Sequence, residues 1–210
     1  MTVQDTTSDA TTGDSQDMIR VQVETTSGDF TVALDSAHAP HTVNNFLQYV
    51  DGGFYDGGRF HRTVRTDNNS NAGLDIKETD SGIDPKAPRG QLPNDEIVIE
   101  VIQGGINPAR SDEQRGPITL ERTSETCLKH SDGTISMARL TPDSAVSDFF
   151  VCINDQPELD FGGGRNQDGQ GFAAFGQVVE GMDVVRAIQT SPSEGQSLTP
   201  AIGIIRITRV

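Results

Sequence analysis

Short runs in which apolar and polar residues alternate recur along most of the chain. The first two, Ile19–Thr25 and Phe30–Leu34, are separated by a Ser-Gly turn, an arrangement typical of a β-hairpin. A third run, RFHRTV at 59–64, follows two glycines. Further strand-like runs recur at 97–105, 133–139, 147–153, 171–179 and 201–210. This spacing predicts a chain built mainly from short strands.

Two segments show helical spacing instead. After Pro40 and before Gly52, apolar residues recur at intervals of three and four, at Val43, Phe46, Leu47 and Val50. The segment 181–189 has a similar face, made of Met182, Val185 and Ile188. Many short strands with only two helices in a Gly-rich chain predict a mainly β protein, a closed eight-stranded antiparallel β-barrel with two flanking α-helices.

Two segments lack any periodic pattern. Residues 1–17 are almost all Thr, Ser, Asp and Gln, and we expect a disordered acidic and polar tail because they cannot bury enough apolar surface to fold. Residues 66–96 are rich in Asn, Asp, Gly and Pro, and they predict a long surface insertion. The remainder, 18–210, is expected to be a single domain carrying this insertion.

Composition narrows the classes of partner. A net charge of -15 argues against nucleic acid, whose phosphates would be repelled. No apolar run reaches membrane-spanning length, so we expect no membrane partner. The start of the chain lacks the pattern of a signal peptide, which favours the cytoplasm, with the periplasm as the alternative if a signal was removed. Aspartate is abundant and lysine scarce, which is compatible with a salt-adapted source and with an ordinary one.

Metal, nucleotide and covalent chemistry lack support in the sequence. The four histidines form no metal-binding pair on a helix face, and no Gly-rich phosphate loop ends in Lys-Ser or Lys-Thr. Asn166, Asp168 and Gly169 resemble part of a calcium loop, but a turn is the simpler interpretation. Cys127 and Cys152 are expected to be buried free thiols, with a single disulfide as the alternative. We therefore expect no cofactor and no metal.

Six short motifs occur in a fixed order. They are FHR at 60–62, QGG at 103–105, GTISMAR at 133–139, SDFFV at 147–151, LDFG at 159–162 and FAAFGQVVEGMDVV at 172–185. In this order they resemble the cyclophilin family of peptidyl-prolyl cis-trans isomerases, with the forms GTISMAR and GFAAFG most similar to bacterial periplasmic-type members. The resemblance implies the cyclophilin-like barrel and an isomerase, or rotamase, that acts on Xaa-Pro bonds during protein folding without a cofactor.

The resemblance makes Arg62 the principal catalytic residue, and elementary chemistry agrees. Rotation about a peptide bond is opposed by about 18–20 kcal/mol because the nitrogen lone pair is delocalised into the carbonyl. Twisting the bond returns that lone pair to the nitrogen, which can then accept a hydrogen bond. A guanidinium stays charged and only donates, so it can stabilise the twisted state without transferring a proton.

Other roles follow from the resemblance at matching positions. Gln103 matches the glutamine that orients the catalytic arginine and the substrate backbone. Phe150 and Leu159 match the proline pocket, and Ala138 matches the small residue beside the side chain that precedes proline. The other expected groove residues are His61, Val101, Arg139, Asp148 and Phe172, and for His61 a purely structural hydrogen bond is an equal alternative.

Some positions depart from the family pattern. Glu100 and Val101 replace Phe-Met, Glu158 replaces a tryptophan of cyclosporin-sensitive members, Asp148 replaces a glutamine and Arg139 an asparagine. These changes leave a second hypothesis, a catalytically weak binding module with the same fold. The expected partners are proline-containing peptides and unfolded or folding proteins, and the expected state is a monomer.

Overall fold

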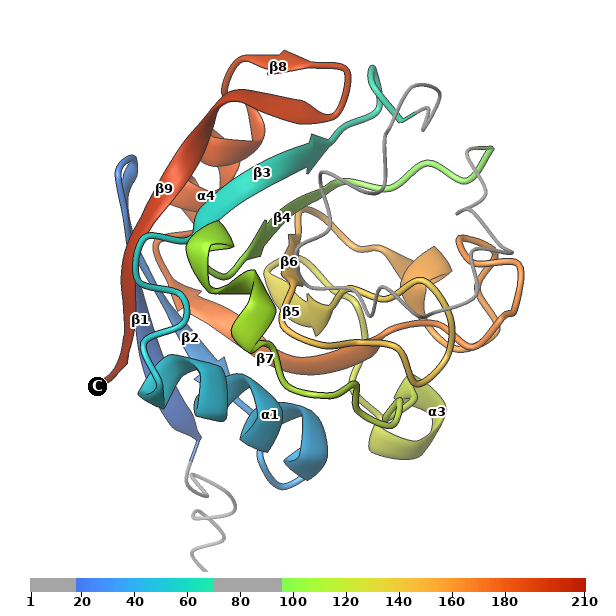
Figure 1. The fold of residues 1–210 in the computed structure, drawn as a ribbon. Helices are drawn as coiled ribbons and strands as arrows, with labels where there is room; N and C mark the ends of the chain where they lie inside the picture. Colours follow the sequence, from blue (N-terminus) through green and yellow to red (C-terminus); the bar gives the residue numbers. More distant parts are fainter. Residues whose placement is uncertain (1–17, 70–95) are drawn as a thin grey trace, which may run out of the picture.

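The computed structural model describes residues 18–69 and 96–210. The tail predicted at 1–17 and most of the insertion predicted at 66–96 lie outside these residues. Within them the chain forms one antiparallel sheet that closes on itself (Figure 1).

The sheet has nine strands in the order β1-β2-β7-β5-β6-β4-β3-β9-β8, and an additional pairing of β1 with β9 closes the first eight into a barrel. Full closure removes the exposed strand edges that an open sheet would leave. The predicted fold class, a closed eight-stranded antiparallel barrel, is therefore confirmed, with β8 as an extra strand beside β9. The strands are β1 (Ile19–Thr25), β2 (Gly28–Leu34), β3 (Arg59–Val64), β4 (Val101–Gly105), β5 (Thr134–Met137), β6 (Phe149–Cys152), β7 (Ala173–Glu180), β8 (Ser193–Glu194) and β9 (Ser197–Arg209).

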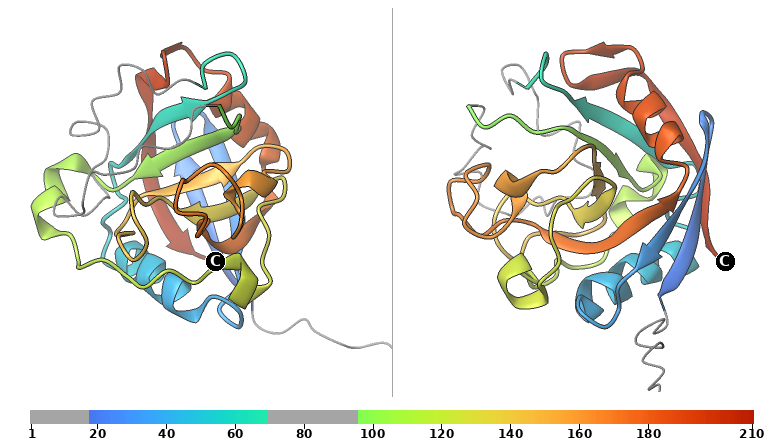
Figure 2. Two further views of the ribbon diagram at one scale, coloured as in Figure 1. Left: turned by 90° about the vertical axis from the view of Figure 1, so that its right-hand side faces the viewer. Right: turned by 180° about the vertical axis from the view of Figure 1, so that it is seen from behind.

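The two predicted helices are α1 (Pro40–Asp51) and α4 (Met182–Gln189), and they lie at opposite ends of the barrel (Figures 1 and 2). The apolar positions predicted for α1 are all buried. The backbone amides at the start of α1 donate to the carboxylate of Glu121, which satisfies groups that a helix end leaves without partners. Three short helices were not predicted: α3 (Thr123–Thr126) and the 3-10 turns η1 (Pro108–Glu113) and η2 (Pro157–Leu159).

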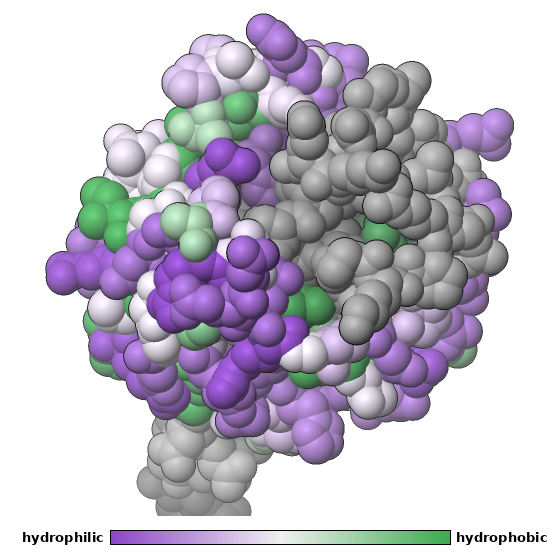
Figure 3. Space-filling model, viewed as in Figure 1, coloured by the Kyte–Doolittle hydropathy of each residue, from purple (hydrophilic) through white to green (hydrophobic). Residues whose placement is uncertain are grey.

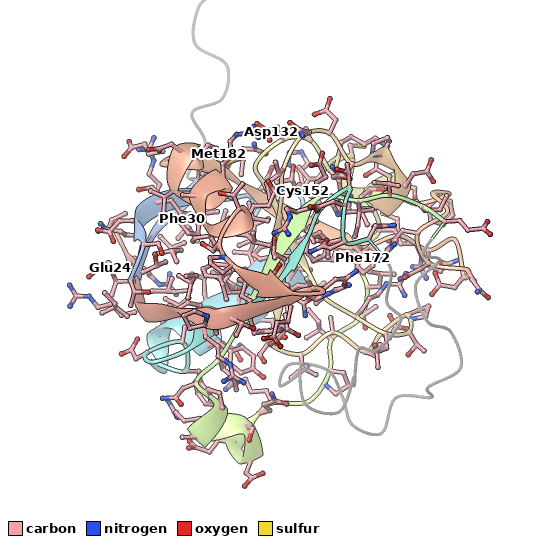
Figure 4. All side chains as sticks on the ribbon, turned by 90° about the horizontal axis from the view of Figure 1, so that it is seen from above. Glu24, Phe30, Asp132, Cys152, Phe172 and Met182 are labelled. Atoms are coloured by element: carbon pink, nitrogen blue, oxygen red, sulfur yellow. The ribbon has the colours of Figure 1, made fainter. Side chains whose placement is uncertain are left out.

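The buried apolar residues fall into two clusters. The main core fills the barrel, and in it Phe46 packs against Tyr55, Phe149 and Phe175 with ring centroids 5.3 to 5.6 Å apart. A second group, here called the outer cluster, lies on the other face of the sheet. It contains Val64, Ile99, Val101, Ala138, Phe150, Cys152, Leu159 and Phe172. In Figure 4, Cys152 and Phe172 of the outer cluster lie apart from Phe30 of the main core.

The fourth strand is shorter than its sequence pattern predicts. Strand character was expected from 97, but β4 begins at Val101. Before it, the carbonyl of Ile97 and the amide of Ile99 bond to the side chain of Asn69. Because a side chain already satisfies these backbone groups, the segment does not join the ladder of the sheet.

In the coloured part of Figure 3 the surface is mainly hydrophilic, and the apolar patches on it are small and separate. Within 18–69 and 96–210, no helix is both long and apolar enough to cross a bilayer.

Both cysteines are free, as predicted, but Cys127 is exposed and only Cys152 is buried. The expectation of a buried Cys127 was wrong because it follows α3 in a left-handed turn at the surface.

Candidate active site

A bulge in β3 decides which way Arg62 points. Phe60 pairs with Gly104 and Arg62 pairs with Gln103, so His61 is an extra residue in the ladder. Strict alternation would place Arg62 on the same face as Phe60, which is buried in the main core. The extra residue shifts the alternation, so Arg62 shares the face of Val64, a member of the outer cluster.

Two glutamines hold the guanidinium of Arg62. Its Nη1 donates to Oε1 of Gln103 at 2.8 Å, and its Nε donates to Oε1 of Gln196 at 2.9 Å. Gln103 lies opposite Arg62 on β4, whereas Gln196 lies between β8 and β9. Arg62 is half-buried, while both glutamines are buried. Both of these acceptors are neutral amides, and a guanidinium keeps its positive charge.

Gln196 was not among the predicted site residues. It is separated from Arg62 by 134 positions, and the hairpin that carries it has no motif in the sequence. Its side chain also donates to the carbonyl of Asn68, and its own carbonyl accepts the amide of Thr63. The turn before β9 is therefore bonded to the chain on the C-terminal side of Arg62, at Thr63 and at Asn68.

The outer cluster forms an apolar wall beside this arginine. Phe150 on β6 pairs with Gln103, so their side chains project from neighbouring strands on one face. Phe150 and Phe172 meet edge to face with ring centroids 5.3 Å apart. Val101, Ala138 and Leu159 are buried in the same cluster. The structure thus brings together the predicted catalytic pair and all the predicted apolar groove residues.

A buried hydrogen-bonded chain supports Phe150 from behind. His130 stacks on its ring at 6.0 Å, and its Nδ1 and Nε2 contact Asp160 Oδ1 at 2.8 Å and Ser136 Oγ at 2.9 Å. Burial lowers the pKa of His130, although the bond to Asp160 opposes this shift. Ser, His and Asp in this order resemble a hydrolytic triad, but Ser136 and His130 are buried, so the chain supports the wall and offers no accessible nucleophile.

Arg139 is buried, and its charge is paired with a carboxylate instead of being exposed in the groove. Its Nη1 and Nη2 donate to the two carboxylate oxygens of Asp168 at 2.7 and 2.9 Å, and its Nε donates to the carbonyl of Gly171. The guanidinium lies 5.0 Å from the ring centroid of Phe172. Arg139 therefore contributes to the groove by fixing Phe172 and the segment before it.

The segment around Asp168 is a turn, as predicted. The amide of Gly169 donates to the carbonyl of Asn166, and the amide of Gln170 donates to Asp168 Oδ1. Burial opposes ionisation of Asp168, but the hydrogen bonds from Arg139 and the Gln170 amide outweigh it and lower the pKa of this carboxyl group. Both oxygens of its carboxylate therefore accept hydrogen bonds from Arg139.

We predict that Asp168→Asn lowers the free energy of unfolding by about 2 kcal/mol, since charge-assisted bonds to a side chain only 1% exposed are weakened. Urea denaturation at neutral pH measures this. Glu113→Gln is the control, because it breaks a similar pair with Arg110 at the surface, where ion pairs contribute little. Equal effects of the two substitutions would contradict the assigned role of Asp168.

The acidic departures from the family pattern have different partners and different exposure. Glu100 accepts a hydrogen bond from Asn154 at the surface, and exposed Glu158 accepts one from the amide of Gly164. Asp148 differs from both because its side chain is 0% exposed. Its Oδ2 accepts a hydrogen bond from Gln103 Nε2 at 3.2 Å. This carboxylate therefore lies beneath the predicted catalytic pair instead of bordering open surface.

His61, the extra residue of the bulge, is neutral near pH 7. Burial, together with the positive charges of Arg62 and Arg59, lowers its pKa to about 4. Its Nε2 lies 3.6 Å from Asp148 Oδ2. A neutral imidazole adds no charge that would compete with Arg62 for the substrate.

In the part of the chain that is described, no group of three or more His, Cys, Asp or Glu side chains could hold a metal ion. The chemistry that the site offers is electrostatic. A fixed guanidinium beside an apolar wall can hold a proline ring and donate hydrogen bonds to the twisted peptide bond.

Comparison with known proteins identifies the family of this chain. The family model described as "Cyclophilin type peptidyl-prolyl cis-trans isomerase/CLD" matches residues 20–209. The chain therefore belongs to the cyclophilin-type peptidyl-prolyl cis-trans isomerases, a family that acts on proline-containing peptides.

Curated relatives include bacterial isomerases. The chain is 29% identical to peptidyl-prolyl cis-trans isomerase cyp18 of Streptomyces antibioticus, over 90% of this chain and 95% of the relative. It is 32% identical to peptidyl-prolyl cis-trans isomerase A of Dickeya dadantii, over 83% of this chain and 73% of the relative. It is 31% identical to peptidyl-prolyl cis-trans isomerase B of Escherichia coli, over 80% and 83% of the two chains.

Solved structures support the fold. A cyclophilin-type isomerase of Cryptosporidium parvum superposes with a TM-score of 0.64 at 20% identity, covering 92% of this chain and 98% of that one. A second structure of that protein, solved in the presence of the dipeptide Ala-Pro, gives a TM-score of 0.63 at 21% identity, covering 91% and 98%.

Proposed function

We propose that this chain catalyses rotation about Xaa-Pro bonds through Arg62, with Gln103 as its partner. The observation that carries the proposal is the 2.8 Å bond between these two side chains, on the face of the sheet that also bears the outer cluster. In this mechanism the proline ring packs against Phe150 and Phe172. The guanidinium then stabilises the lone pair that appears on nitrogen as the peptide bond twists.

The other predicted residues have supporting roles in this proposal. Leu159, Val101 and Ala138 complete the apolar wall, and Arg139 fixes Phe172 through its contact with the ring. Excluding water from this wall strengthens the interaction between the guanidinium and the twisted bond. Because the charge stays on a group that cannot transfer a proton, the reaction needs neither a cofactor nor a covalent intermediate.

We further propose that the substrates are exposed Xaa-Pro segments of unfolded or folding proteins and that the chain acts as a monomer. Turnover is tested with Ala-Pro and Phe-Pro peptides in a protease-coupled assay. The expected result is acceleration of the slow cis-to-trans phase in proportion to enzyme concentration. Binding of these peptides without acceleration would instead identify a catalytically weak binding module.

A further inference from the structure

A buried carboxylate lies directly behind the catalytic pair. Asp148 Oδ2 accepts from Nε2 of Gln103 at 3.2 Å, and Oε1 of the same amide accepts from Arg62 at 2.8 Å. The three side chains therefore form a continuous hydrogen-bonded chain that runs from carboxylate to amide to guanidinium. The resemblance to the cyclophilin family places a glutamine at this position, and here it is an aspartate.

Asp148 and Arg62, at the two ends of this hydrogen-bonded series, determine how the amide of Gln103 is oriented. An ionised carboxylate only accepts hydrogen bonds, and a guanidinium only donates them. The NH₂ group of Gln103 must therefore face Asp148, and its carbonyl oxygen must face Arg62. A neutral amide in place of Asp148 could present either an oxygen or an NH₂ group, so the orientation of the Gln103 amide would then depend on Arg62 alone.

The surrounding structure fixes the carboxylate in turn. The carbonyl of Asp148 accepts the amide of Ala138 at 2.9 Å, which anchors its backbone beside the groove. A Cβ added at Gly105 would overlap Asp148 Oδ1, so the side chain occupies space that only a glycine leaves open. The neighbouring carbonyl of Ser147 accepts the hydroxyl of buried Tyr55 at 2.7 Å.

We propose that Asp148 is a positioning residue for catalysis, which holds the amide of Gln103 so that its carbonyl oxygen fixes Arg62. The inference rests on the proposed isomerase function of Arg62. A charge-assisted bond in a buried site also polarises the amide and strengthens its bond to the guanidinium. Asp148 itself does not contact the substrate in this arrangement.

The first test is Asp148→Asn, which keeps the shape of the side chain but removes its charge. We expect kcat for an Ala-Pro peptide to fall about tenfold, equivalent to about 1.4 kcal/mol, with KM nearly unchanged because the apolar wall is untouched. NMR line-shape analysis of the exchanging peptide separates binding from rotation. Asp112→Asn, at an exposed position of η1, makes the same change of charge and should leave both constants unchanged.

The second test separates positioning from a general effect on the fold. If Asp148 acts through Gln103, Asp148→Asn should have little further effect on kcat in a Gln103→Ala background. A full tenfold loss in that background, or an unchanged kcat in the single variant, would overturn the inference.

The third test does not depend on turnover. The side-chain NH₂ resonances of Gln103, assigned by their loss in Gln103→Ala, should shift in Asp148→Asn and remain in place in Asp112→Asn. Unshifted resonances would overturn the inference even if the protein is an active isomerase. A shift in a protein without turnover would support the hydrogen-bonded chain and refute the proposed function alone.

Discussion

Replacing Arg62 with alanine is expected to slow isomerisation of an Ala-Pro peptide at least about tenfold, equivalent to about 1.4 kcal/mol of barrier. The reason is that the guanidinium is the only group in the proposed mechanism that donates to the twisted bond. The protein should still fold, because Arg62 lies on the outer face of the sheet and is only half-buried. The rate is measured by the protease-coupled assay, and stability by urea denaturation.

Two further variants sharpen this result. Arg62→Lys should restore only part of the rate, because a point charge cannot bond to Gln103 and Gln196 in the planar geometry that the guanidinium uses. Arg59→Ala removes the same charge from an exposed position on the same strand and should leave the rate unchanged. If Arg62→Ala kept the full rate, the proposed mechanism would be wrong.

The barrel was predictable partly because strands such as β1 alternate in the way that burial on one face requires. In β1, Val21 and Val23 are fully buried, and Gln22 between them is only partly buried. The apolar face of α1 was predictable for the same reason, since its period of three and four residues matches a helix. These patterns are local, so the sequence contains all the information needed to find them.

The orientation of Arg62 was not predictable from the same pattern. The alternation of β3 places Phe60 and Arg62 on one face, and the bulge at His61 reverses this. A bulge depends on how two neighbouring strands pair, and RFHRTV contains no glycine or other local residue that marks it. Only the resemblance of FHR to the family motif indicated a functional arginine.

The hydrogen-bond partners of the site residues could not be predicted from local sequence patterns either. Gln196 reaches Arg62 across 134 positions, and Asp148 reaches Gln103 across 45. Arg139 and Asp148 were expected to border the groove, yet closure of the barrel buries both side chains. A buried charge needs a partner, and which partner it finds is decided by tertiary structure, not by neighbouring residues.

The protonation of His61 is expected to have a large effect on the free energy of unfolding at acidic pH. Burial lowers the pKa of His61 from 6.5 to about 4. As the pH falls below 6.5, the unfolded chain binds a proton at this residue and the folded chain does not, so protonation favours unfolding. The stabilising contribution is therefore complete above pH 6.5, decreases as the pH falls towards 4, and levels off below. Across this window it amounts to about 3 kcal/mol.

His130 should act in the same direction, because burial lowers its pKa as well. Carboxyl groups with lowered pKa values, such as Asp160 and Asp168, contribute in a different window. Their ordinary value is 3.8, so their stabilisation is lost only as the pH falls below it. Measurements between pH 7 and pH 4.5 therefore report mainly on the two buried histidines.

We predict that His61→Gln reduces the loss of stability between pH 7 and pH 4.5 by about 2 kcal/mol or more, because a glutamine does not titrate. Urea denaturation at the two pH values measures the loss for each protein, so any fixed cost of the substitution cancels. His41→Gln removes an exposed imidazole at the start of α1 and should retain the pH dependence of the unmodified protein. If His61→Gln lost as much stability as the unmodified protein, His61 would not be the neutral residue that the bulge buries beside Arg62.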